Sequence, residues 1–336
     1  MKRKMLAQLF SMTGSIGLLE RFQRNSLMLV LVYHRIGDAN SAPFDSGVFS
    51  CGPQALDRQV QALKKQFNVI SLAEANRIIE GQSALERNSV LLTFDDGYRD
   101  NYDLAFPILQ KHGVEGLFFL PTSFVGSRTL PWWDQIASLI KASKQRRIDL
   151  TYPVARSFLM ERGDRQAVIR SALRLYRDAR TTDGDQFIKR LAEVCDVPRI
   201  TQAPERIFLS WDEARTMKRA GMSFGSHTHS HPLMNKLSFN DQVEELCRSR
   251  SMLEAELGGT IDTVAYPVGS ANAFSSTTFE AMQQTGYRKG FSYYGGVNQY
   301  GNISPFNVLR VEGGKGDHLE TFRMRMAMLT AAGRDF

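Results

Sequence analysis

The chain has 336 residues and carries 42 Lys and Arg against 35 Asp and Glu, a formal net charge of +7, with an apolar fraction of 43%. This composition is typical of a globular protein and excludes a chain dominated by disorder, while the length fits either one barrel with insertions or two smaller domains. The positive charge favours contact with anions without choosing among them, and three separated cysteines without a CxxC pair argue against a disulfide framework or a thiolate zinc site.

The N-terminal segment, residues 1–26, is predicted to contain an amphipathic helix over residues 4–23. Basic residues precede it, but polar residues interrupt the apolar stretch and no small-residue cleavage site is evident. No run in the chain approaches the roughly 18 apolar residues that cross a bilayer. The helix could cap the domain or lie on a membrane surface. We therefore expect a cytoplasmic protein, with peripheral contact at the inner face of the membrane as a further expectation.

From residue 27 to about residue 330, apolar strand-like runs alternate with amphipathic helical segments, which predicts an α/β fold. Strands are expected at residues 27–33, 69–70, 90–94, 117–121, 223–226, 263–266, 288–292 and 308–311. Helices are expected at residues 54–66, 72–79, 98–111, 211–219 and 238–257. Residues 128–206 contain no convincing strand, and we interpret them as a helical insertion with helices at 136–143, 166–178 and 185–194.

Two short motifs follow predicted strands: Thr93-Phe94-Asp95-Asp96-Gly97, and the run from His227 to Pro232, which contains three histidines. Two adjacent carboxylates are costly unless a cation or a shared proton offsets their charge. Histidines at spacings of two and four could supply the other half of a divalent metal site. Because catalytic groups of α/β barrels lie at the carboxyl ends of the strands, we expect both motifs to meet at one mouth.

With Ala265-Tyr266-Pro267-Val268-Gly269 after a third strand, these motifs resemble those of the polysaccharide deacetylase family, also called the NodB-homology family or carbohydrate esterase family 4. The resemblance covers residues 27–128 and 206–330, and the run from Leu31 to Arg35 is similar to the first barrel strand of one branch. It implies a distorted (β/α) barrel of about seven strands with a helical insertion. The implied activity is metal-dependent removal of N-acetyl groups from amino sugars of a glycan or lipid-linked saccharide, in surface polysaccharide biosynthesis.

The resemblance implies that Asp96, His227 and His231 bind one divalent metal ion, with zinc the first choice. Two imidazoles and one carboxylate leave open positions for water and substrate, as in catalytic metal sites. In an extended chain His229 would share their face and could compete as a ligand. The alternative for all three histidines is a solvated polar loop.

Asp95 is then the general base that takes a proton from the attacking water, or alternatively a further ligand or the N-cap of the following helix. The family binds the developing oxyanion with a backbone N–H whose position here is Val268. Ala265 replaces the family's arginine in that motif. We expect Arg310 to orient Asp95 instead, against the alternative of an ordinary surface arginine.

The family's late histidine, its general acid, has no clear counterpart. We favour His34, at the end of the first strand, over His318, which is expected in the first turn of the last helix; His34 could also be only structural. Trp132 and Trp133, which open the insertion, are predicted to stack on a sugar ring. Tyr266, in the third motif, is predicted to be a substrate-binding residue. The alternative for the tryptophans is that they anchor the insertion.

Two other functions remain open. The same site could hydrolyse O-acetyl esters, whose leaving group needs less help from a general acid. The protein could also be a catalytically silent glycan-binding protein, although such a protein has little need of Asp95. We expect an N-acetylated saccharide as the partner and no nucleic acid, because no recognisable nucleic-acid-binding module is present.

Overall fold

The computed structural model describes residues 26–83, 87–160, 164–314 and 318–332. They form two compact units. The barrel unit comprises residues 26–37, 50–126 and 208–332, and the inserted unit comprises residues 38–49 and 127–207. The predicted helix over residues 4–23 lies outside the described residues, so it stays a prediction, as do the cytoplasmic location and the membrane contact. Among the described helices, none combines the length and the apolar character that crossing a membrane requires.

The barrel unit is built on parallel strands that pair in one continuous order. These are β1 (Leu27–Tyr33), β5 (Ser89–Phe94), β6 (Leu117–Leu120), β9 (Ser223–Ser226), β10 (Thr263–Ala265) and β11 (Lys289–Phe291). The segment 308–312 then bridges the two ends of this row. Val308 pairs with Phe291 of β11, and Val311 of β13 (Val311–Glu312) lies opposite Leu31 of β1. This closure confirms the predicted distorted (β/α) barrel.

Two short strands extend the sheet: β4 (Asn68–Val69) pairs with β5, and β12 (Asn298–Gln299) runs antiparallel to β1. β2 (Arg35–Ile36) and β3 (Phe49–Cys51) form a separate two-stranded sheet. The closing strand begins at Val311 rather than at Val308, so the expected strand over residues 308–311 is displaced toward the C-terminus. The residues before Val311 make only the single bridge at Val308, because they cross from one edge of the sheet to the other.

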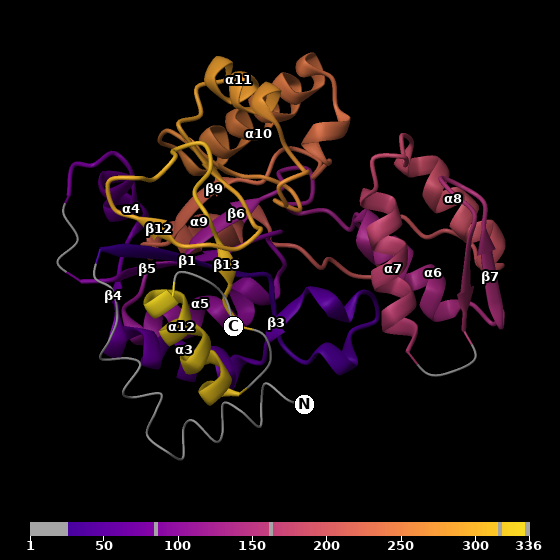
Figure 1. The fold of residues 1–336 in the computed structure, drawn as a ribbon, viewed down its shortest axis with the longest axis horizontal. Coiled ribbons are helices and arrows are strands. Elements are labelled where there is room, and N and C mark those ends of the chain that lie inside the picture. Colours follow the sequence, from indigo (N-terminus) through magenta and orange to yellow (C-terminus); the bar gives the residue numbers. More distant parts are fainter. Residues whose placement is uncertain (1–25, 84–86, 161–163, 315–317, 333–336) are drawn as a thin grey trace. The chain divides into compact units, whose positions relative to one another are not determined.

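Helices cover the outside of the barrel. They are α3 (Pro53–Gln66), α4 (Leu72–Ile79), α5 (Phe106–His112), α9 (Trp211–Arg219), α10 (Phe239–Leu257), α11 (Ser276–Gln284) and α12 (Leu319–Ala332). Figure 1 shows α3 and α12 side by side. The expected helix over residues 98–111 is confirmed except at its start, because it begins with a π-helical turn (Asn101–Ala105) that continues into α5. Gly113 ends α5 in the left-handed conformation that glycine adopts readily, and Ser238 caps α10, both as predicted.

The inserted unit contains α6 (Trp132–Ala142), α7 (Arg165–Arg177) and α8 (Gly184–Cys195), which correspond to the three predicted helices. The expectation of no strand is wrong, because β7 (Arg147–Leu150) and β8 (Arg156–Leu159) form an antiparallel hairpin. These four-residue strands are too short for a clear pattern. Residues 38–49 also belong to this unit: the buried carboxylate of Asp134 accepts a hydrogen bond from the Asp45 amide at 3.0 Å.

Strand side chains of the barrel alternate between two apolar clusters. The outer cluster, shared with the surrounding helices, includes Leu29, Leu31, Leu92, Phe94, Phe118, Val264 and Tyr266. The inner cluster combines residues of α4 with residues from strands all around the barrel, among them Met28, Val30, Leu91, Phe119, Ala265, Phe291 and Val308. A Cβ atom on Gly225 of β9 would lie 2.6 Å from the Phe119 ring, so this glycine makes room for an inner phenylalanine. This alternation decides which side chains reach the mouth.

Candidate active site

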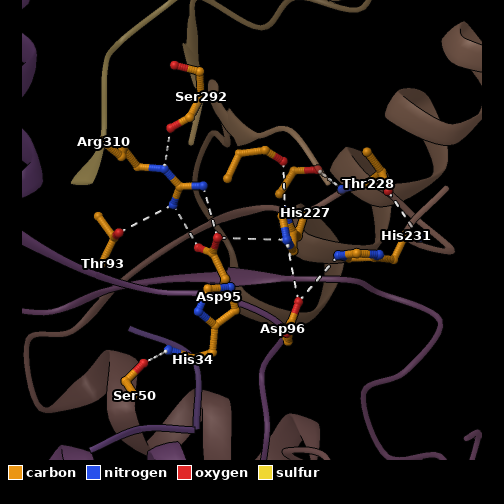
Figure 2. A network of polar contacts seen from close by, with 12 residues as sticks. His34, Ser50, Thr93, Asp95, Asp96, His227, Thr228, His231, Ser292 and Arg310 are labelled. Atoms are coloured by element: carbon orange, nitrogen blue, oxygen red, sulfur yellow. Dashed lines mark hydrogen bonds and ion pairs between the residues drawn. The ribbon is translucent and has the colours of Figure 1, made fainter. Parts of the chain in front are cut away.

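Four polar side chains continue the inner face at the carboxyl ends of the strands. Each lies an even number of residues beyond an inner position of its own segment, and alternation therefore directs it to the mouth. They are His34 after β1, Asp95 after β5, His227 after β9, and Arg310 in the closing segment. Figure 2 shows them together with Asp96 and His231. The structure thus brings the two distant motifs to one place, as the sequence predicts.

Asp96, His227 and His231 form a buried group whose ligand atoms all lie within 4.8 Å of one another. The Asp96 Oδ1 atom is 3.5 Å from His227 Nε2 and 3.4 Å from His231 Nε2. The Nδ1 atom of His227 donates a hydrogen bond to the Ala265 carbonyl at 2.7 Å, which leaves its Nε2 lone pair directed at Asp96. Two imidazole nitrogens and one carboxylate oxygen at this spacing fit a divalent cation.

The electrostatics of this group also fit a cation. Burial by itself raises the pKa of Asp96, but the close contacts with the imidazoles of His227 and His231 outweigh it and hold the pKa well below its ordinary value. Burial lowers the pKa of His227, yet the neighbouring charges of Asp95 and Asp96 raise it overall. Within the described residues the two buried carboxylates face one guanidinium, that of Arg310, so negative charge is in excess.

The loop from His227 to His231 departs from extended geometry. Thr228 and His231 have left-handed backbones, with φ of +65° and +59°. The turn at Thr228 directs the His229 ring away, and its Nδ1 lies 2.8 Å from the Thr122 hydroxyl. The alternative of His229 as a metal ligand is therefore wrong. It assumed an extended run in which the three imidazoles share a face.

Asp95 is held by Arg310 through two parallel bonds, Nη1 to Oδ1 at 2.8 Å and Nη2 to Oδ2 at 2.9 Å. Arg310 is fully buried and also donates to the Ser292 carbonyl at 2.9 Å and to the Thr93 hydroxyl at 3.3 Å. Burial tends to raise the pKa of Asp95, but the charges of Arg310 and His227 lower it below its ordinary value.

The predicted contact between Arg310 and Asp95 is confirmed. The shortest approach of Asp95 to a histidine is 3.9 Å, longer than either approach of Asp96, and Asp95 is not part of the ligand group. Its carboxylate is engaged by the guanidinium rather than by helix amides, which rules out the N-cap alternative. Thr93 and Ser292, which hold Arg310, were not anticipated. The spacing of two between Thr93 and Asp95 is the signal that could have revealed Thr93.

His34 is half-buried, and its charge is among those that lower the pKa of both Asp95 and Asp96. Its backbone is fixed on both sides, because Ser50 accepts its N–H at 2.9 Å and Asn101 donates to its carbonyl at 2.7 Å. Its ring centroid is 5.8 Å from that of Tyr293. His318, by contrast, is exposed and precedes α12.

The third motif contains a strained turn. Val268 has φ of +63°, which is rare for a β-branched residue, and Gly269 has φ of +62°. A Cβ atom on Gly269 would lie 2.7 Å from the Tyr293 amide nitrogen, so only glycine fits. Among the described residues no acceptor is recorded for the Val268 N–H. Left-handed non-glycine residues occur in all three motifs, at Asp96, Thr228, His231 and Val268, as expected where function constrains the backbone.

Tyr266 is not placed to touch a substrate with its side chain, and that prediction is wrong. It is 1% exposed, its hydroxyl donates to the Phe306 carbonyl at 2.8 Å, and its ring stacks on Phe274 at 4.2 Å. The reason is alternation: Ala265 faces the barrel interior, so Tyr266 faces the outer cluster. The Tyr266 ring therefore packs in the hydrophobic core beneath α11.

Trp132 and Trp133 lie at the start of α6 in the inserted unit. Trp132 stacks on Tyr176 of α7 with ring centroids 4.3 Å apart, and Trp133 is 5% exposed. Both rings therefore contribute to packing inside that unit. Sugar contact by Trp132 and Trp133 stays a prediction.

Comparison with known proteins agrees with this geometry. The family model for polysaccharide deacetylases matches residues 82–151 and 179–290, together more than half of the chain. YxkH of Bacillus subtilis (strain 168), described as a candidate polysaccharide deacetylase, is 21% identical over 261 residues, which are 78% of this chain and 62% of YxkH. This chain therefore spans less than two thirds of the length of that relative.

Two solved structures share the fold. IcaB from Ammonifex degensii superposes with a TM-score of 0.60 at 19% identity, covering 92% of this chain and 99% of IcaB. The Streptococcus pyogenes deacetylase PplD, solved in complex with acetate, superposes with a TM-score of 0.55 at 19% identity, covering 86% of this chain and 93% of PplD. With the family model matched across both motifs of the site, the chain belongs to the polysaccharide deacetylase family.

Proposed function

We propose that this protein is a metal-dependent hydrolase that removes N-acetyl groups from amino sugars of a glycan or lipid-linked saccharide during surface polysaccharide biosynthesis. The proposal rests on one observation: a group that can bind a cation lies beside a carboxylate that can act as a base, at the carboxyl ends of the barrel strands. A buried Asp-His-His group can bind a cation, and beside it Asp95 is fixed by Arg310 rather than belonging to that group. Family membership supports the acetylated saccharide as substrate.

Asp96, His227 and His231 would bind the ion, with zinc the first choice for two imidazoles and one carboxylate. When bound, a divalent ion polarises an acyl oxygen and acidifies water. Asp95 accepts the proton of the attacking water, and Arg310 keeps both oxygens of Asp95 in a fixed plane. The Val268 N–H donates to the acyl oxygen as charge develops there. His34 returns a proton to the departing amine.

The first test measures acetate release from a panel of N-acetylated saccharides and lipid-linked sugars, with and without a chelator. We expect release that the chelator abolishes and added zinc restores. His231→Ala should lose this activity, while the matched variant His229→Ala should retain it, because the His229 ring lies outside the ligand group. Release that is indifferent to the chelator and to His231→Ala would contradict the proposal.

The same experiment separates the two remaining alternatives. At equal zinc loading, faster release from O-acetyl than from N-acetyl substrates would identify an esterase. Saccharide binding without any acetate release would identify a glycan-binding protein.

Tyr266→Phe tests the assignment of Tyr266 to the core. The change leaves the Phe306 carbonyl without its donor, and we expect the free energy of unfolding to fall by about 1–2 kcal/mol. KM for the acetylated substrate should stay unchanged, since the hydroxyl faces the outer cluster. Chemical denaturation and steady-state kinetics measure the two effects. A raised KM with unchanged stability would return Tyr266 to the substrate site.

A further inference from the structure

Glu245, on the face of α10 that meets the end of β9, holds the backbone of the histidine loop. Its Oε2 atom accepts the amide hydrogens of His229 at 2.9 Å and of Ser230 at 2.8 Å, and its Oε1 atom accepts the Ser230 hydroxyl at 2.7 Å. We propose that Glu245 is a positioning residue that presets His227 and His231 for the metal ion. This inference rests on the proposed function, in which these two histidines bind that ion.

The loop needs such a restraint because two of its residues are in strained conformations. Left-handed backbones at Thr228 and His231 are unfavourable for non-glycine residues and persist only when surrounding contacts fix them. Between them lie the two amides that Glu245 binds. Bonds from amides to a carboxylate are charge-assisted and stronger than those between neutral groups. One side chain thus satisfies three donors at the centre of the strained segment.

The opposite side of the loop is held by the chain after β6. Thr122 donates its amide hydrogen to the Thr228 carbonyl at 3.2 Å, and Ser123 donates to the His229 carbonyl at 2.9 Å. The loop is therefore fixed through its carbonyls on one side and through its amides by Glu245 on the other. Removing Glu245 would release one side only, so we expect a looser loop in a folded protein.

The position of Glu245 on α10 fits this role. Ser249, one turn further along the same face, has its hydroxyl 2.8 Å from that of Ser226 at the end of β9. Glu245 and Ser249 thus lie on the face of α10 that contacts the chain around His227 and His231. The preceding residue, Glu244, is exposed and forms a surface ion pair with Arg248 at 3.4 Å instead of a hydrogen bond to a loop amide. Glu244 therefore provides a matched control of the same charge on the same helix.

The test titrates purified full-length protein with zinc chloride alone, against a competing chelating dye, for wild type, Glu245→Ala, Glu245→Gln and Glu244→Ala. Loss of a group that orients a metal ligand typically weakens affinity by roughly 10–100-fold, and we expect this for Glu245→Ala. Glu245→Gln, which keeps the shape and one carbonyl acceptor, should weaken zinc binding less. Glu244→Ala should match wild type. At saturating zinc, kcat of Glu245→Ala should recover to near the wild-type value.

The outcomes distinguish failure of the proposed function from failure of the role assigned to Glu245. If wild type itself does not bind zinc, the proposed function fails. If wild type binds zinc and Glu245→Ala binds it equally well, the role of Glu245 is refuted. Reduced kcat at saturating zinc with unchanged zinc affinity would refute it too. If circular dichroism shows that Glu245→Ala does not fold, the comparison is made with Glu245→Gln instead. A folded Glu245→Gln variant with wild-type zinc affinity would then overturn the inference.

Discussion

Asp95→Asn is expected to lower kcat for acetate release by roughly 10²–10⁴-fold, the usual contribution of a positioned general base. Asparagine keeps the shape of the side chain and can still accept a bond from Arg310, but its amide cannot take up the proton of the attacking water. Zinc affinity should change little, because Asp95 lies outside the ligand group of Asp96, His227 and His231. Steady-state kinetics and zinc titration measure the two effects.

The contrast with Asp96 makes this result diagnostic. Asp96→Asn replaces a proposed ligand, and we expect it to lose zinc affinity and activity together. If Asp95→Asn behaves like Asp96→Asn, then Asp95 is a ligand and not a base. If Asp95→Asn retains full activity, the proton passes to another group and the proposed mechanism is wrong.

The second large effect concerns stability. Arg310→Met removes the cation that faces the carboxylate of Asp95, which is only 2% exposed. Breaking a buried ion pair by removing one partner leaves an uncompensated charge and typically costs about 3–5 kcal/mol. We expect a loss of this size in the free energy of unfolding, measured by chemical denaturation near neutral pH. Activity should fall as well, since Asp95, the proposed base, loses both of its orienting bonds.

A double-mutant cycle separates charge from packing. Asp95→Asn combined with Arg310→Met leaves no unpaired carboxylate, so the double variant should be less destabilised than the two single changes predict together. Arg288→Met, which removes an exposed arginine elsewhere in the barrel unit, should alter stability by less than about 0.5 kcal/mol. Strictly additive effects of the two changes at the site would show that the pair is not coupled.

Local sequence patterns predict much of the candidate active site. The acidic motif and the histidines follow strands whose apolar runs are visible in the sequence, and parallel strands bring their carboxyl ends to one edge. These two facts are enough to place Asp95, Asp96, His227 and His231 together. The long helices are equally predictable, since 3.6-residue periodicity and capping serines depend only on neighbouring residues.

Alternation within the strands is also predictable, but it does not say which face is the inner one. Ala265 and Tyr266 are neighbours in one motif, yet the first faces the barrel interior and the second the helices. Which of the two faces inward depends on how the sheet closes, and a shift of one residue exchanges them. The wrong assignment of Tyr266 has this origin.

The α/β class, the ligand motifs and the family resemblance all follow from the amino-acid sequence, because each depends on residues close together in the chain. Three features instead depend on the folded arrangement: the two parallel bonds from Arg310 to Asp95, the direction of the His229 ring, and the association of residues 38–49 with residues 127–207. Arg310 is more than two hundred residues from Asp95 in the chain. It reaches Asp95 because the closing segment crosses from β11 to β1, and this placement follows from barrel closure, which no local pattern encodes.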